Sequence, residues 1–174
     1  MTTRRTFRLD EIMPLWMKYI YSLKKYADMT DPPAVMPLNE KFQRENLAGY
    51  VKNTEYRCLL IEENKKKIGF LFIGTGSQTN IATDYYIAEL YIEKEYRRQR
   101  IAHSVMKSFF EEHPGRYCYF VINGNTPALS FWNRIINDFN ATRLISLPDE
   151  GTPSYCTQYG FAVSIDKRKK EKKS

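Results

Sequence analysis

Residues 87–105 read IAELYIEKEYRRQRIAHSV, a strand-like run followed by a cluster of cations and then by an apolar pattern with helical spacing. A helix leaves its first backbone N–H groups without carbonyl partners, and the positive end of its dipole lies at the same point. Where a strand leads directly into a helix, these donors form an anion-binding site. Arg97, Arg98 and Arg100 add positive charge there. The stretch therefore predicts a strand, an anion-binding loop and a helix in succession.

The same alternation of strand and helix continues beyond this stretch. Residues 101–113 and 126–139 each carry an apolar stripe at the spacing of an amphipathic helix, and residues 116–122, RYCYFVI, form a strand-like run between them. Two closing strands are expected in residues 142–147 and 154–165. Because both helices can cover one sheet, these elements predict an α/β or α+β sandwich with mixed strand directions.

The first part of the chain predicts two helices and a hairpin. Apolar residues from Ile12 to Leu23, Tyr19 among them, recur at helical spacing, and the polar turn NKKK separates two strand-like runs. The expected elements are a short strand at residues 6–9, a helix capped by Asp10, a surface loop with three prolines at 28–39, a helix at 39–53, and a hairpin of strands 56–63 and 66–76.

The length of 174 residues is that of one ordinary domain. We expect a single domain over residues 1–166, followed by a basic tail at residues 167–174. The run KRKKEKK in this tail holds six cations and one glutamate, so it supplies most of the net charge of +7. Such a run predicts a solvated, disordered tail, and the alternative is a weak contact with RNA or another anionic surface.

The composition, 43% hydrophobic and 27% charged, is typical of a soluble globular protein. No run approaches the roughly 20 apolar residues of a membrane span, and the N-terminal MTTRRTFRLDEI has no apolar signal-peptide core, so we expect a cytoplasmic protein without membrane contact. Cys58, Cys118 and Cys156 lie far apart in strand-like contexts. They predict reduced, mostly buried thiols and neither a disulfide framework nor a metal site.

Residues 85–139 resemble the core of the GNAT superfamily of N-acetyltransferases, and in detail a bacterial subgroup of predicted acetyltransferases. The superfamily's acyl-CoA loop, Q/R-x-x-G-x-G/A after a strand, falls on residues 97–102, RRQRIA. Its second motif, N-x-x-A-x-x-F/Y, falls on residues 125–131, NTPALSF. The resemblance implies a mixed, mostly antiparallel sheet with splayed central strands, here residues 87–93 and 117–122, and helices on both faces.

The resemblance also implies acetyl-CoA as cosubstrate and no metal. The pantetheine arm of acetyl-CoA is expected between the splayed strands, and the pyrophosphate of acetyl-CoA is expected on the loop. The implied coenzyme-binding residues are Leu90, Tyr91 and Ile92 in the strand, Arg97, Arg98, Gln99, Arg100, Ile101 and Ala102 in the loop, and Asn125, Ala128, Phe131 and Trp132 at the second helix.

Arg100 departs from the motif because it stands where the superfamily has its first glycine. An arginine is sterically tolerable there if the backbone enters the helix in the ordinary way, which is what we expect. A positive φ at this residue would instead favour glycine and would put the coenzyme site in doubt.

Acetyl transfer to an amine needs a base for the amine, a donor for the carbonyl oxygen and a proton for the leaving thiolate. The resemblance implies Glu89 as the base, and the alternative is an ordinary glutamate on a strand face. The backbone N–H of Tyr91 is the expected oxyanion donor if the strand bulges there. The usual acid is a tyrosine where this chain has Trp132, so Tyr119, Tyr155, Tyr159 or solvent must supply the proton.

These features predict an acetyl-CoA-dependent N-acetyltransferase that acts by direct transfer in a ternary complex. The acceptor is expected to be a small-molecule or peptide amine, and the protein a monomer or homodimer. The alternative is a module of the same fold that binds acyl-CoA or a partner without catalysis, which Arg100 and Trp132 favour.

Overall fold

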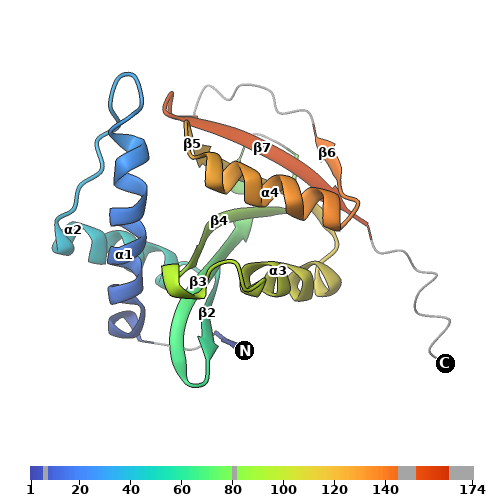
Figure 1. Cartoon of the computed structure of the whole chain (residues 1–174), viewed down its shortest axis with the longest axis horizontal. Coiled ribbons are helices and arrows are strands. Elements are labelled where there is room, and N and C mark those ends of the chain that lie inside the picture. Colours follow the sequence, from blue (N-terminus) through green and yellow to red (C-terminus); the bar gives the residue numbers. More distant parts are fainter. Residues whose placement is uncertain (6–7, 80–81, 145–151, 165–174) are drawn as a thin grey trace.

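The computed structural model describes residues 1–5, 8–79, 82–144 and 152–164. Two short 3-10 turns, Gly76–Gln78 and Lys94–Tyr96, flank the fourth strand. The helices and strands, shown in Figure 1, are β1 (Thr2–Arg4), α1 (Leu9–Ala27), α2 (Glu40–Lys52), β2 (Arg57–Glu63), β3 (Lys66–Thr75), β4 (Tyr85–Ile92), α3 (Ile101–Glu112), β5 (Gly115–Ile122), α4 (Thr126–Asp138), β6 (Thr142–Leu144) and β7 (Cys156–Val163).

The strands form one sheet in the order β1-β2-β3-β4-β5-β7-β6. Every neighbouring pair is antiparallel except β4 and β5, which are parallel. This parallel pair is joined only from Tyr85↔Tyr117 to Ile87↔Tyr119. Past that point both strands continue, within the described residues, without pairing to each other. The predicted mixed, mostly antiparallel sheet with splayed central strands is therefore confirmed.

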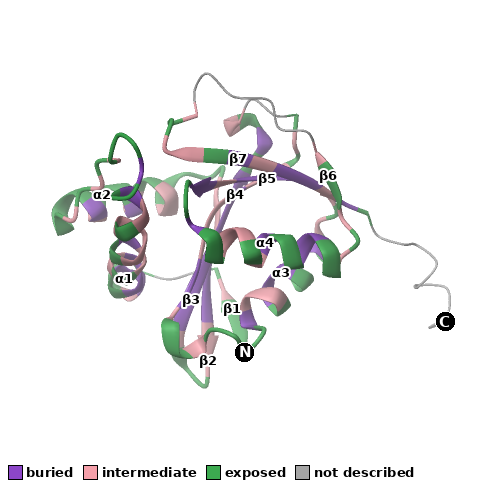
Figure 2. Ribbon diagram, turned by 45° about the horizontal axis from the view of Figure 1, so that its top comes forward, coloured by how far each residue is buried: buried purple, intermediate pink, exposed green. Residues whose placement is uncertain are grey.

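Helices cover both faces of the sheet, as predicted. Figure 1 shows α1 and α2 on one side and α3 and α4 on the other. Ile12, Trp16 and Leu47 pack with Phe70 on the first face, and Val105 and other residues of α3 and α4 form a second core on the opposite face. Figure 2 shows the buried residues gathered on the strands and on the helix sides that face them. Each large apolar side chain buried in this way contributes about 1.5–3 kcal/mol.

The expected hairpin is confirmed by the pairing of β2 with β3, which runs to Glu63↔Lys66. Asn64 and Lys65 connect the strands with φ of 49° and 65°. Two successive left-handed residues match the right-handed twist of a hairpin, and Asn is among the residues that tolerate this conformation best.

The N-terminal elements begin earlier than the sequence predicted. The first strand is β1 rather than residues 6–9, of which 6 and 7 lie outside the described residues. Asp10 is not the cap of α1, because the helix already begins at Leu9 with Arg8 as its N-cap. Asp10 lies in the first turn instead and forms an ion pair with Arg44 of α2 at 2.6 Å.

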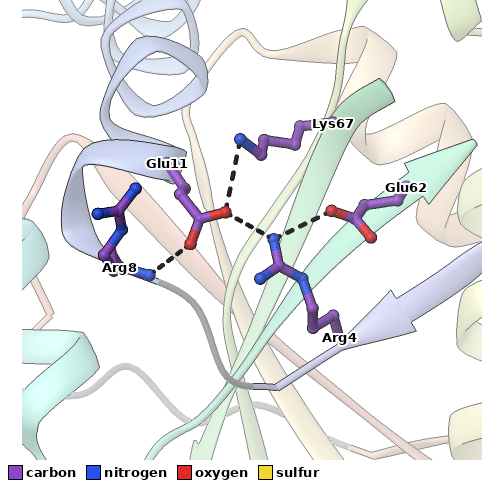
Figure 3. A network of polar contacts seen from close by, with 5 residues as sticks. All are labelled: Arg4, Arg8, Glu11, Glu62 and Lys67. Carbon is purple, nitrogen blue, oxygen red and sulfur yellow. Dashed lines mark hydrogen bonds and ion pairs between the residues drawn. The ribbon is translucent and has the colours of Figure 1, made fainter. Parts of the chain in front are cut away.

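Glu11 explains the earlier helix start, as Figure 3 shows. Its carboxylate accepts the backbone N–H of Arg8 at 2.7 Å and pairs with Arg4 at 2.8 Å and Lys67 at 3.5 Å. Arg4 also pairs with Glu62 of β2 at 3.1 Å. The hydrogen bond from Arg4, followed by that from Arg8, lowers the pKa of Glu11 to about 2. The network therefore joins β1, β2 and β3 to the start of α1.

The predicted helices at residues 101–113 and 126–139 and the loop at residues 28–39 are also confirmed. Part of the closing strand predicted at 142–147 and the basic tail at 167–174 lie outside the described residues. No helix in the described part of the chain combines the length and apolar character that crossing a membrane requires.

Candidate active site

The loop between β4 and α3 has the geometry of an anion-binding site. The backbone N–H of Ser104 donates to the carbonyl of Arg100 at 2.9 Å and makes the first hydrogen bond of α3. The N–H groups of Ile101, Ala102 and His103 precede this bond, so they have no acceptor within the helix. They point out of the helix start, where the positive end of its dipole lies.

Two side chains of this loop turn back to the chain instead of toward a ligand. Nε of Arg97 donates to the carbonyl of Ile92 at 2.8 Å, and its guanidinium lies 5.4 Å from the ring centre of Tyr91. Nε2 of Gln99 donates to the carbonyl of Glu95 at 3.0 Å. The first contact fixes the loop to the end of β4 and the second fixes it to the preceding 3-10 turn, whereas Arg98 is exposed.

The expectation of an ordinary helical entry at Arg100 is wrong. Arg100 is the N-cap of α3 and lies in the left-handed region, with φ 60° and ψ 13°, and Arg98 also has a positive φ of 63°. The chain has to reverse its direction between the end of β4 and the start of α3, and two left-handed residues make this turn. The side chain of Arg100 extends to Asp138 at the end of α4, at 3.5 Å.

We expect Arg100→Gly to raise the free energy of unfolding by about 0.5–1 kcal/mol, because glycine adopts the left-handed conformation without steric cost. The exposed ion pair with Asp138 that this change removes contributes little. Urea denaturation measures the difference. Arg134→Gly is the control, because that exposed residue lies inside α4, where glycine lowers stability by about 1 kcal/mol. Destabilisation of both variants would contradict the prediction.

A cavity of about 120 Å³ lies where β4 and β5 stop pairing. Among the predicted coenzyme-binding residues, Leu90, Asn125, Ala128 and Trp132 line it. The other lining residues are Tyr19 and Leu23 of α1, Ile87 and Ala88 of β4, and Tyr119, Phe120, Val121 and Ile122 of β5. The cavity therefore opens between the two strands that the resemblance predicted to be splayed.

The remaining predicted coenzyme-binding side chains do not line this cavity. Tyr91 lies on the α1 face and is 6% exposed, whereas Ile92 and Ile101 pack in the core beneath α3 and α4. Ala102 packs at the edge of that core. Phe131 contacts Trp132 edge to face, with ring centres 5.0 Å apart. These side chains therefore pack within the two cores and not around this cavity.

The start of α4 is fixed by Asn125, whose Oδ1 accepts the backbone N–H of Ala128 at 3.3 Å. One turn later Trp132 is buried and stacks on Tyr119, with ring centres 4.5 Å apart, and Tyr119 stacks in turn on Tyr159 at 5.4 Å. Of the three tyrosines considered as proton donors, only Tyr119 lines the cavity; Tyr155 and Tyr159 do not. Burial raises the pKa of Tyr119, so its phenol stays protonated near neutral pH.

Strand β4 contains a bulge, but at Ala88 and not at Tyr91. Phe72 of β3 pairs with Glu89 and Ile73 pairs with Ile87, which leaves Ala88 as the extra residue. Tyr91 pairs regularly with Phe70, so the strand does not bulge at Tyr91. The role of its backbone N–H as oxyanion donor required a bulge there, and the observed bulge lies three residues earlier. Because of the bulge, Ala88 and Glu89 both lie on the face of the sheet that α1 and α2 cover, whereas Ile87 lies on the face that α3 and α4 cover.

Glu89 lies half-buried beneath α1 and α2 and accepts two hydrogen bonds from tyrosines. The Tyr19 hydroxyl donates to its Oε2 at 2.5 Å, and the Tyr50 hydroxyl donates to its Oε1 at 3.0 Å. Burial raises the pKa of Glu89 to about 7, although the two hydrogen bonds act in the opposite direction. Tyr19 also lines the cavity, so the carboxylate lies one hydrogen bond from the cavity wall.

Sequence reasoning did not identify Tyr19 and Tyr50 as site residues. Tyr19 belongs to the apolar stripe of its helix, and this spacing predicts an amphipathic helix without indicating a role in the site. The one available signal is that a tyrosine on a buried helix face needs a partner for its hydroxyl.

A larger cavity of about 470 Å³ lies at the other end of β4, lined among others by Tyr56, Arg57, Gly74, Tyr85 and Phe109. None of the predicted site residues lines it. In the described part of the chain, no three His, Cys, Asp or Glu side chains are grouped so that they could hold a metal ion.

Comparisons with known proteins agree with this geometry. Residues 21–136 match the sequence profile of the acetyltransferase (GNAT) family. An acetyltransferase from Thermus thermophilus has a similar structure, with a TM-score of 0.64 and 16% identity over 94% of this chain and 98% of that one. PaiA N-acetyltransferase from Thermoplasma acidophilum, solved with coenzyme A, gives a TM-score of 0.63 and 14% identity over 92% and 98% of the two chains. No curated protein matches in sequence.

Proposed function

The chain belongs to the acetyltransferase (GNAT) family and is an acyltransferase, and we propose that it transfers an acetyl group from acetyl-CoA directly to an amine. The observation that carries this proposal is the cavity between the diverging strands β4 and β5. It extends from Ala128 at the start of α4 to Tyr19, and Tyr19 donates a hydrogen bond to Glu89. A thioester held in the cavity would thus lie close to a carboxylate that can take a proton.

The residues that would hold the coenzyme follow from the same geometry. The N–H groups of Ile101, Ala102 and His103, together with Arg98, would bind the pyrophosphate at the start of α3. The edge of β4 that faces β5 is unpaired past Ile87, so it offers backbone groups to the amides of the pantetheine arm. When bound, acetyl-CoA supplies an activated acetyl group as a thioester.

The proposed reaction forms a C–N bond and breaks the C–S bond of the thioester. Glu89 accepts the proton that the amine loses, and a pKa of about 7 suits a base that works near neutral pH. Tyr119 lines the same cavity and its phenol stays protonated, so its hydroxyl, or solvent, would supply the proton that the leaving thiolate needs. The acceptor in this proposal is a small-molecule or peptide amine.

Thermal unfolding with coenzyme tests the proposal first. We expect acetyl-CoA and CoA, but not ATP, to raise Tm, because a ligand at 100 times its Kd adds about 2.7 kcal/mol of stability. For a domain of this size the shift should be on the order of 5–10 °C. A panel of amines then tests acetyl-CoA consumption. The absence of any shift at millimolar coenzyme would overturn the proposal.

A second candidate function is a module that binds acyl-CoA without catalysis. Two observations favour it: Arg100 has the positive φ at which the coenzyme loop favours glycine, and Trp132 stands where the superfamily usually has the tyrosine that protonates the thiolate, which an indole cannot do. The same two experiments distinguish the functions, since a non-catalytic module would show the coenzyme-dependent rise in Tm and would consume no acetyl-CoA with any amine.

A further inference from the structure

We infer that Tyr19 and Tyr50 are positioning residues for Glu89, which hold both oxygens of its carboxylate and stabilise its charged form. This inference rests on the proposed function, in which Glu89 is the base. The two hydroxyls come from different helices, Tyr19 from α1 and Tyr50 from α2. Tyr19 is 70 residues and Tyr50 is 39 residues away from Glu89 in the sequence. Each binds a different oxygen, so rotation of the carboxylate would break both hydrogen bonds.

The two hydroxyls are held in place by the packing of their rings. The ring of Tyr19 meets Phe70 edge to face, with centres 5.5 Å apart, and that of Tyr50 lies 5.3 Å from Phe72 and 4.9 Å from Tyr56. Because the rings cannot move freely, their hydroxyls are preorganised toward Glu89. A carboxylate has about four lone-pair positions, so each oxygen keeps capacity for a proton or a substrate hydrogen bond.

Phenylalanine would fill the same space as either tyrosine, so packing alone does not account for the hydroxyls. Among the residues that the structure describes, the titratable groups close enough for Glu89 to raise their pKa are the phenols of Tyr19, Tyr50, Tyr56 and Tyr86 and the thiol of Cys156. All are uncharged near neutral pH. The carboxylate therefore depends for stabilisation of its negative charge on the two hydroxyls that bond to it.

The effect on proton transfer has a defined sign. A hydrogen bond to the ionised form lowers the pKa of a carboxyl group, and burial raises it. Removing one hydroxyl leaves the burial unchanged, so the pKa of Glu89 should rise. We expect Tyr19→Phe and Tyr50→Phe each to move the acidic limb of the kcat/KM profile upward by about one pH unit, as the loss of a hydrogen bond to a charged group implies. Below the limb, each variant should be about tenfold slower than wild type, and the difference should narrow as pH rises through the limb.

Tyr56→Phe is the matched control. Its ring contacts that of Tyr50 and the charge of Glu89 helps to raise its pKa, but the two hydrogen bonds to the carboxylate come from Tyr19 and Tyr50. We expect this variant to keep the wild-type acidic limb. An equal shift in all three variants would mean that the limb responds to general packing, and would overturn the inference.

A titration that needs no acceptor amine separates this inference from the proposed function. The ionisation of Glu89 is followed by NMR in the full chain with 13C-labelled glutamate carboxyls, assigned with Glu89→Gln. An upward shift of the Glu89 titration in Tyr19→Phe and Tyr50→Phe supports the inference, and an unchanged titration in both overturns it. Failure of the proposed function has a different signature: Glu89→Gln would keep full activity, or no amine would be acetylated, whatever the titration shows.

Discussion

Replacing Glu89 by Gln is expected to lower kcat for acetyl transfer by a factor of about 10²–10⁴, the usual contribution of a positioned general base. The carboxamide keeps the shape of the side chain and can still bond to Tyr19 and Tyr50, but it cannot take the proton from an amine. Glu89 does not line the cavity proposed for the coenzyme, so the Kd for acetyl-CoA should stay close to the wild-type value.

The pH dependence of kcat/KM is a second test of Glu89 as the base. With a pKa of about 7, Glu89 must lose its proton to act as the base, so wild-type kcat/KM should rise as pH increases through 7. The limb should be absent from the residual activity of Glu89→Gln. Glu93→Gln is the matched control, because Glu93 lies on the same side of β4 and pairs with Lys18 at the surface of α1. A Glu89→Gln enzyme with wild-type rate and limb would mean that Glu89 is an ordinary glutamate on a strand face.

The pH dependence of stability tests the raised pKa of Glu89 without any measurement of enzyme activity. The folded pKa of Glu89 is raised above the ordinary value of 4.5, so the folded state binds more protons than the unfolded state between pH 4.5 and about 7. The stability that this group contributes at low pH is therefore lost as pH rises through 7. Because Gln carries no charge, the Tm of Glu89→Gln relative to wild type should increase from pH 5 to pH 8.

The features that could be predicted from the sequence depend on local periodicity. The hairpin of β2 and β3, the helices α3 and α4, and the loop between β4 and α3 each follow from the spacing of apolar residues and from the turn residues within one short segment. The resemblance added the divergence of β4 and β5, because no local signal indicates where two strands stop pairing.

The errors concern properties that the tertiary structure sets. The bulge at Ala88 depends on the register between β3 and β4, and the left-handed conformation of Arg100 depends on how the chain turns from the sheet into α3. The contact of Tyr19 with Glu89 joins residues 70 positions apart. In each case the residue type was also compatible with a simpler local interpretation, so only the folded structure could show which conformation or contact the residue has.

The second large effect is expected for Ala128→Leu, which should weaken CoA binding about 10- to 100-fold. Ala128 lines the cavity between β4 and β5, in the first turn of α4 and one turn before Trp132. Leucine adds three carbon atoms at a wall of a space of only about 120 Å³. Overpacking of this kind costs about 1–3 kcal/mol, and each 1.4 kcal/mol is tenfold in Kd.

Isothermal titration with CoA measures this change directly, and Ser130→Leu is the matched control. Ser130 is an exposed residue of the same helix and does not line the cavity, so it receives a leucine without reducing the space. Leucine is nearly as good a helix former as alanine, so α4 should persist in both variants. If both variants kept the wild-type Kd, the pantetheine arm would lie elsewhere than between β4 and β5. Weaker binding by Ala128→Leu alone would instead locate the coenzyme in this cavity, beside the start of α4.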